Sequence, residues 1–215
     1  MSYLAQGLES AVQSNLDLLF LPGASGQTEF WQPVVTALSA YPAKRIVAYP
    51  SFAGYPADPE VNSFESLQAY VIDQVTAPSV LIAQSMGGIF AVQAALQKSQ
   101  QIKGLVLVAT SGGIDLSAFS AQDWREEYQQ AFDLPDWFAV TKSQGVAQAL
   151  AQIRCPVLLI WGDQDPISPV TVGQYLAQQL HDAQLHIVTT GEHDLAKVHA
   201  TQVSALIATF LETIV

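Results

Sequence analysis

Six short apolar segments recur along the chain, and each has the length of one buried β-strand. Their residues form unbroken runs rich in Val, Ile and Leu, a pattern typical of parallel strands that are covered on both faces. We place these strands at residues 16–21, 45–49, 80–83, 105–109, 157–161 and 185–188. Segments with the helical spacing of apolar positions follow five of them, at residues 30–38, 64–75, 86–97, 170–180 and 203–211.

This alternation predicts an α/β fold with a mostly parallel, doubly wound sheet of about six to eight strands, joined by right-handed crossovers. A chain of 215 residues is long enough for one sizeable core and short for two, so we expect residues 1–215 to form a single domain. Asn62, followed three residues later by Glu65, indicates a capping box at the start of the second helix.

One interval departs from the alternation. Residues 114–152 separate the fourth and fifth predicted strands, which is too long for an ordinary connection. The interval is also too aromatic for a disordered segment, because it holds Phe119, Trp124, Tyr128, Phe132, Trp137 and Phe138. The pattern favours a small helical cap insertion over one edge of the sheet. A surface helical hairpin that packs its own aromatic side chains is the open alternative.

The charge balance excludes several classes of partner. The chain has 19 acidic and 8 basic residues, a formal net charge of −11, and the basic residues are scattered between Lys44 and Lys197. A field of this sign repels phosphate backbones and anionic lipids, so we expect no nucleic acid and no membrane among the partners.

The single cysteine, Cys155, excludes an internal disulfide and a cysteine zinc site.

The first residues carry no positive side chain and open no long apolar run, so we expect no secretory signal. No stretch approaches the roughly 20 apolar residues that a membrane-spanning helix needs. We therefore expect a cytoplasmic protein.

The third predicted strand is followed by a turn of small residues with a serine at its centre. Ala83-Gln84-Ser85-Met86-Gly87 reads Ala-x-Ser-x-Gly, close to the Gly-x-Ser-x-Gly turn that exposes a nucleophilic serine between a strand and a helix. The helix N-terminus behind such a serine favours a developing oxyanion. Taken alone, this motif also fits a structural glycine-rich turn.

The first predicted strand ends in a second turn of small residues, Leu21-Pro22-Gly23-Ala24-Ser25-Gly26. We expect the backbone N–H groups of Ala24 and Met86 to point at one spot, as the two donors of an oxyanion hole do. A phosphate-binding loop is the alternative, but the lysine and the glycine spacing of such loops are missing.

Two more strand ends carry ionisable side chains. The fifth predicted strand is followed by Asp163 and Asp165, and the sixth by Gly191-Glu192-His193. In an open parallel sheet, ligands bind beyond the carboxyl ends of the strands. The chain order serine, acid, histidine is that of one class of hydrolases.

Over essentially the whole chain, these motifs resemble the α/β-hydrolase superfamily, and within it the small single-domain carboxylesterases that cleave pimeloyl-carrier-protein methyl esters. The resemblance implies the α/β-hydrolase fold, with Ser85 as nucleophile, His193 as base and Asp165 as acid. It also implies that Ala24 and Met86 supply the oxyanion-hole N–H groups. Asp163 and Asp115 stay open as alternative acids.

Three departures from the family pattern matter. Pro22 replaces the usual histidine before Gly23, which puts the oxyanion geometry in question and leaves the nucleophile untouched. Ala83 replaces the first glycine of the serine turn. Only about fifteen residues precede the first predicted strand, so the two leading antiparallel strands of the family are expected to be short or missing and the sheet to have six strands.

These residues predict a serine hydrolase that cleaves a carboxylic ester or thioester through an acyl-enzyme. The expected partner is a small-molecule ester with an apolar acyl or alkyl group, and the expected substrate-binding residues are Phe30, Trp31, Trp124 and Trp137. Arg125 could meet a carboxylate, but pairing with a neighbouring acid is the favoured reading.

No cofactor and no metal are expected, because His181, His186 and His199 show no ligand spacing. We expect a monomer or a homodimer. The alternatives are a cofactor-free lyase, a perhydrolase, or a catalytically silent binding protein on the same fold; a serine in place of a carboxylate nucleophile argues against a haloalkane dehalogenase.

Overall fold

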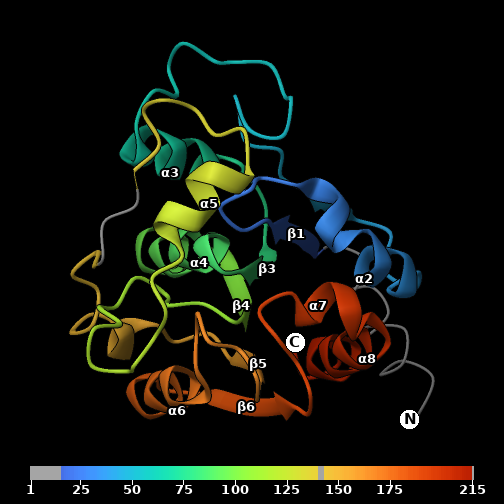
Figure 1. Ribbon diagram of the computed structural model, residues 1–215. Coiled ribbons are helices and arrows are strands. Elements are labelled where there is room, and N and C mark those ends of the chain that lie inside the picture. Colours follow the sequence, from blue (N-terminus) through green and yellow to red (C-terminus); the bar gives the residue numbers. More distant parts are fainter. Residues whose placement is uncertain (1–15, 140–142, 215) are drawn as a thin grey trace, which may run out of the picture.

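Residues 16–139 and 143–214 are described by the computed structural model, in which they form one six-stranded sheet flanked by helices (Figure 1). The spatial order is β2-β1-β3-β4-β5-β6, and every neighbouring pair is parallel. The predicted parallel sheet is therefore confirmed. The strands are β1 (Asp17–Leu21), β2 (Lys44–Ile46), β3 (Ser79–Gln84), β4 (Ile102–Val108), β5 (Val157–Gly162) and β6 (Ala183–Val188).

Helices cover both faces of the sheet. One face packs against α3 (Phe64–Asp73), α4 (Met86–Gln97) and α6 (Val170–Gln179). The other face packs against α2 (Gln32–Ala37), α7 (Leu195–Val198) and α8 (Ala200–Leu211). Successive side chains of a strand point to opposite faces, so a strand between two helical layers must be apolar at every position.

The capping box at the start of α3 is formed by Ser63 and Ser66 and not by Asn62 and Glu65, so that prediction is wrong by one residue. Ser63 is the N-cap of α3: its Oγ accepts a hydrogen bond from the Ser66 N–H at 3.1 Å, and the Ser66 Oγ accepts one from the Ser63 N–H at 2.9 Å. A serine hydroxyl is short enough to close this box in place of a glutamate. The Asn62 side chain instead donates to the Pro59 carbonyl.

The described part of the interval between β4 and β5 contains two short helical pieces, α5 (Arg125–Ala131) and the 3-10 turn η2 (Leu150–Gln152). Some of its aromatic rings pack within the interval, such as Trp124 on Tyr128 at 5.1 Å. Others pack outside it, since Phe138 lies 5.2 Å from Phe52 in the loop after β2. The interval thus packs aromatic rings on itself, as a surface hairpin would, and on the rest of the fold, as a cap would. That it forms a cap insertion within a single domain stays a prediction.

The strand order changes direction between β1 and β3. From β1 the chain crosses to β2 on one side, and β3 then lies on the other side of β1. Loops that leave two such neighbouring strands in opposite directions open a binding crevice between them. The loops after β1 and β3 are those that carry Ala24 and Ser85.

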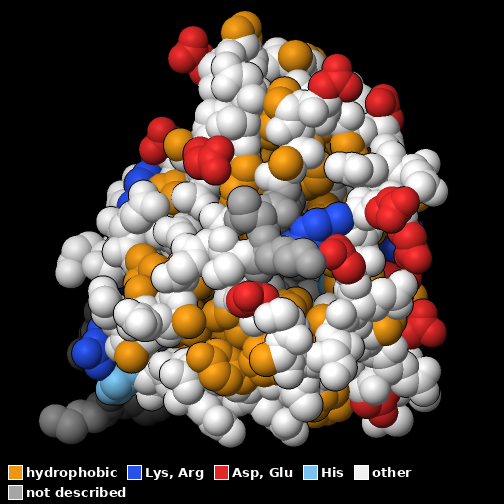
Figure 2. Space-filling model, turned by 60° about the vertical axis from the view of Figure 1, so that its left-hand side comes forward, with side chains coloured by type: hydrophobic (Ala, Val, Ile, Leu, Met, Phe, Trp, Pro, Cys, Tyr) orange, Lys and Arg blue, Asp and Glu red, His pale blue; other side chains and the backbone are white. Residues whose placement is uncertain are grey.

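The expectations of short or missing leading strands and of no secretory signal concern residues 1–15, which lie outside the described residues. In the described ranges, no helix has the length and apolar character needed to cross a bilayer. On the face drawn in Figure 2, Asp and Glu side chains are spread over the surface, and the few Lys and Arg side chains lie apart from one another.

Candidate active site

Ser85 lies between β3 and α4 in a strained backbone conformation, with φ 53° and ψ −121°. Such a conformation costs a non-glycine residue about 1–3 kcal/mol and persists only where the surroundings enforce it. Here the Ser85 N–H donates to the Val108 carbonyl at 3.1 Å, and the Ser85 carbonyl accepts from the Gly88 N–H at 3.0 Å. At Gly87 a Cβ would lie 2.5 Å from the Leu21 oxygen, so only glycine lets α4 start this close to the loop after β1.

The structure brings Ser85, His193 and Asp165 into one hydrogen-bonded chain. His193 Nε2 lies 3.0 Å from Ser85 Oγ, and His193 Nδ1 lies 2.8 Å from Asp165 Oδ2. The Asp165 side chain is fully buried, and its Oδ1 accepts from the N–H groups of Ile167 at 2.8 Å and Ser168 at 3.0 Å. Because an ionised carboxylate only accepts, Nδ1 carries the ring proton and Nε2 faces the serine as an acceptor.

Asp165 is the carboxylate that contacts His193, and the two alternative acids lie elsewhere. Asp163 is exposed, and Asp115 is exposed with its Oδ1 accepting from the Ser117 N–H at 2.9 Å. A close approach of the Gly162 and Gly191 backbones joins the loop that carries Asp165 to the loop that carries His193. A Cβ at Gly191 would lie only 2.9 Å from the Gly162 Cα, so both positions require glycine.

The loop after β1 is anchored without a histidine at position 22. The Leu21 carbonyl accepts from Trp31 Nε1 at 3.1 Å, and the Pro22 carbonyl accepts from the Tyr49 hydroxyl at 2.8 Å. Burial raises the pKa of Tyr49 well above its ordinary value, so its hydroxyl remains a donor. Tyr49 belongs to no motif, and sequence reasoning missed it.

Of the two expected oxyanion donors, Ala24 lies in this anchored loop and Met86 lies at the start of α4. Ala24 and Met86 are both buried. Met86 is the first residue of α4, so its N–H has no acceptor in the preceding turn of the helix. Within residues 16–139 and 143–214, no acceptor takes a hydrogen bond from the Ala24 N–H.

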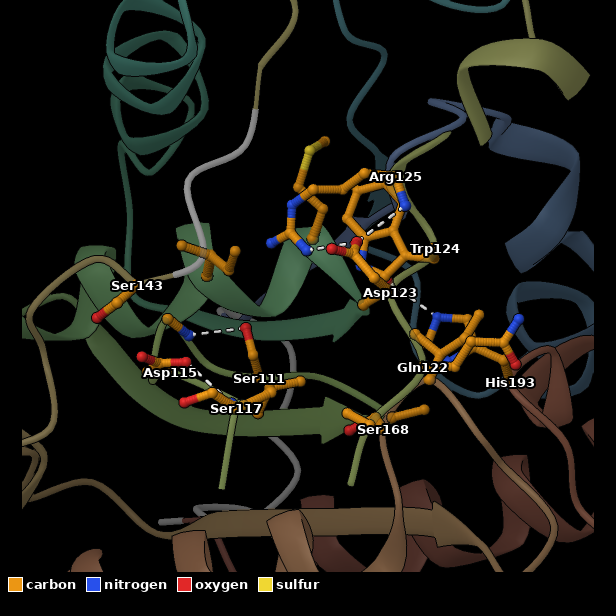
Figure 3. A pocket seen from close by; sticks show the side chains of 18 of the residues that line it. Ser111, Asp115, Ser117, Gln122, Asp123, Trp124, Arg125, Ser143, Ser168 and His193 are labelled. Atoms are coloured by element: carbon orange, nitrogen blue, oxygen red, sulfur yellow. Dashed lines mark hydrogen bonds and ion pairs between the residues drawn. The ribbon is translucent and has the colours of Figure 1, made fainter. Parts of the chain in front are cut away.

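A pocket of about 110 Å³ opens beside Ser85 and His193. Figure 3 shows Ser111, Asp115 and Ser117 together at one end, with His193 and Ser168 at the other. The lining mixes polar and apolar side chains, and it runs from Ser85 and His193 to the interval after β4. The apolar lining residues are Met86, Ile89, Ala109, Leu116, Ala121, Trp124 and Ile167.

Of the four expected substrate-binding aromatics, Trp124 lines this pocket and the other three lie outside its lining. Trp31 is fully buried, packs on Phe20 at 5.5 Å, and is part of the core. Phe30 packs on Trp31 at 5.2 Å, and Trp137 packs on Phe52 at 5.8 Å. A substrate-binding role for these four side chains stays a prediction.

The Arg125 guanidinium and the Cys155 thiol are two further groups whose environment bears on their chemistry. Arg125 Nη1 pairs with Asp123 Oδ1 at 2.9 Å, and its guanidinium lies 5.2 Å from the Trp124 ring (Figure 3). Burial raises the pKa of the Cys155 thiol to about 11, so it remains a thiol at neutral pH. The described parts of the chain contain no group of three or more His, Cys, Asp or Glu residues that could hold a metal ion.

Comparison with known proteins assigns the family. The sequence profile of the alpha/beta hydrolase family matches residues 18–205. Serine hydrolase BPHL of Mus musculus is 27% identical over 100 residues, which are 46% of this chain and 32% of BPHL, so the chain spans about a third of that relative. A pimeloyl-[acyl-carrier protein] methyl ester esterase of Vibrio parahaemolyticus is 23% identical over 222 residues, covering 82% of this chain and 87% of the esterase.

The fold comparison agrees with the sequence comparison. The solved structure of a thermophilic esterase from Thermogutta terrifontis superposes with a TM-score of 0.74 at 17% identity, covering 94% of this chain and 91% of that one. The sheet, the strained serine turn and the profile match over most of the chain lead to one conclusion: the protein belongs to the alpha/beta hydrolase family.

Proposed function

We propose that the protein hydrolyses a small carboxylic ester or thioester by covalent catalysis at Ser85. The observation that carries this proposal is the unbroken hydrogen-bonded chain from Ser85 through His193 to Asp165. The esterases among its relatives agree with it, because the Vibrio parahaemolyticus enzyme aligns over most of both chains.

In the proposed reaction, His193 Nε2 takes the proton of the Ser85 hydroxyl while Oγ attacks the ester carbonyl. Asp165 holds the Nδ1 tautomer and stabilises the imidazolium that forms. The N–H groups of Ala24 and Met86 stabilise the oxyanion, and each such donor contributes about 10²–10³ in rate in a well-studied protease. His193 then protonates the leaving alcohol or thiol, and water attacks the acyl-enzyme by the same route.

The pocket favours a short acyl or alkyl group. Its volume of about 110 Å³ is below the range of about 300–1,000 Å³ that is usual for drug-sized ligands. The lining combines apolar side chains, among them Met86, Ile89 and Trp124, with polar ones. We expect the activity on p-nitrophenyl esters to be highest for acetate to butyrate and to fall at least about tenfold at octanoate; equal rates along the series would contradict this size limit.

The Ser85→Ala variant tests the proposal. It should retain the unfolding temperature of the wild type within a few degrees and lose turnover of p-nitrophenyl butyrate by at least about 10⁴-fold. Ser204→Ala is the matched control, because the Ser204 hydroxyl only donates to the Thr201 carbonyl within α8. Wild-type rates in both variants would refute the assignment of Ser85, and a catalytically silent protein would show no turnover in any of the three.

A further inference from the structure

Thr110 directs its hydroxyl at the backbone of the serine turn. It follows β4 after Ala109 and is 1% exposed. Its Oγ1 donates to the Ser85 carbonyl at 2.5 Å and accepts from the Gly112 N–H at 3.0 Å. Thr110 belongs to none of the turns that carry Ser85, Asp165 and His193, and it is absent from the lining of the pocket.

The Ser85 carbonyl and the Met86 N–H belong to the same peptide unit. The described peptide bonds are all trans, and in a planar trans unit the C=O and the N–H point in opposite directions. A donor that fixes the carbonyl therefore also fixes the direction of the N–H. The Thr110 hydroxyl, with the Gly88 N–H at 3.0 Å, holds the carbonyl, and the Met86 N–H points away from them.

The same residue links the serine turn to the loop that carries Asp165. The Thr110 carbonyl accepts from Ser168 Oγ at 3.3 Å, and Ser168 Oγ in turn accepts from Trp161 Nε1 at 3.1 Å. The Ser168 N–H donates to Asp165 Oδ1 at 3.0 Å. Thr110 and Ser168 are each 1% exposed, so water does not compete for these hydrogen bonds.

We propose that Thr110 is a positioning residue of the oxyanion hole: its hydroxyl sets the orientation of the Ser85–Met86 peptide unit and thereby aims the Met86 N–H. This inference rests on the proposed function, because it needs an oxyanion to form at that site. A hydrogen bond to the carbonyl also polarises the peptide unit, which strengthens its N–H as a donor. The Thr110 hydroxyl touches no reacting atom and acts on the reaction through this peptide unit.

The Thr110→Val variant tests the proposal, because valine keeps the shape and removes the hydroxyl. A methyl group needs roughly 3.3–3.6 Å from a carbonyl oxygen, where the hydroxyl lies at 2.5 Å, so the Ser85–Met86 unit must rotate or shift. We expect kcat on p-nitrophenyl butyrate to fall about 10- to 100-fold, with KM within about threefold of the wild type. Thr110→Ser, which restores the hydroxyl, should recover kcat to within about threefold.

Inhibition by a transition-state analogue separates a loss of oxyanion stabilisation from a general disturbance of the fold. A short alkyl trifluoromethyl ketone forms a hemiketal with the serine and places its oxyanion in the hole, so its Ki should rise in Thr110→Val by about the factor by which kcat/KM falls. Ser204→Ala serves as control for the loss of one hydroxyl hydrogen bond elsewhere in the fold, and its kcat and Ki should equal those of the wild type.

Wild-type kcat in Thr110→Val, or an equal loss in Thr110→Ser, would overturn the proposal. If Thr110→Val does not fold, Thr110→Ala removes the hydroxyl without inserting a methyl group beside the carbonyl, and the same comparison with Thr110→Ser applies. The outcome is distinguishable from failure of the proposed function: in that case the wild type itself has no esterase activity above that of Ser85→Ala.

Discussion

Tyr49 donates a hydrogen bond to the Pro22 carbonyl in the loop after β1 at 2.8 Å, and Trp31 donates one to the carbonyl of Leu21, the last residue of β1, at 3.1 Å. Both side chains are fully buried, so these bonds are protected from water. Together they hold the loop that carries Ala24. This is the loop in which Pro22 replaces the histidine that is usual in the family. The substitution at Pro22 is therefore compatible with an ordered oxyanion loop.

The Tyr49→Phe variant should lower both stability and turnover. The Pro22 carbonyl loses its donor, and leaving a buried polar group unpaired costs about 1–3 kcal/mol. We expect this loss in urea unfolding, and a fall in kcat of about 3- to 30-fold because the loop is less well held. Tyr70→Phe on α3 is the control; equal effects of the two variants on kcat would contradict a role of Tyr49 in the loop.

The raised pKa of Tyr49 also predicts a pH dependence of stability. The folded protein keeps the phenol protonated above the unfolded value of about 10, so the contribution of Tyr49 is complete below that pH and is lost as the pH rises above it. Between pH 9 and 11.5, the free energy of unfolding should fall more steeply in the wild type than in Tyr49→Phe. Parallel curves would show that Tyr49 does not contribute.

Residues with a motif were easier to find than residues without one. Ser85, Asp165 and His193 stand in recognisable turns at strand ends, and the fold brings them within hydrogen-bond distance. Tyr49 and Thr110 act on backbone carbonyls, an interaction that any hydroxyl can make and that leaves no pattern in the sequence. Their partners become visible only once the strands are in place.

Among the helices and strands, those with a clear pattern of apolar residues could be predicted from the sequence. The predicted helix 86–97 coincides with α4, and the buried strands β3 and β5 were found within about a residue at each end. The edge strand β2 covers only Lys44–Ile46, because it pairs with a single neighbour over three positions. The length and aromatic content of the interval after β4 favoured helices there but did not locate α5 (Arg125–Ala131) or η2 (Leu150–Gln152).

The start of α4 offers a test at this level. In Gly87→Ala the new Cβ would meet the Leu21 and Pro22 oxygens at 2.5 and 2.6 Å, and neither backbone group can move without displacing the loop after β1. We expect a loss of about 2–4 kcal/mol in unfolding free energy and a loss of esterase activity. Gln97→Ala, at the exposed end of the same helix, should change stability by less than about 0.5 kcal/mol. A Gly87→Ala variant as stable as Gln97→Ala would contradict this packing.

For the whole molecule, the net charge of −11 gives a field that acts on charged substrates at a distance. For esters of similar size, kcat/KM of an anionic ester should rise with added salt, that of a cationic ester should fall, and that of a neutral ester should stay constant. A change of about two- to tenfold between 10 and 300 mM NaCl is the expected size. The same salt dependence for all three esters would show that the field does not reach the site.

The most direct measurement of the central claim is the site and stoichiometry of reaction with a fluorophosphonate, read by intact mass and peptide mapping. We expect one adduct per chain, located on Ser85, and labelling slowed by at least about 10³-fold in His193→Ala, because the hydroxyl then lacks its base. An unmodified Ser85 in the folded wild-type protein, or an adduct on another residue, would contradict that claim.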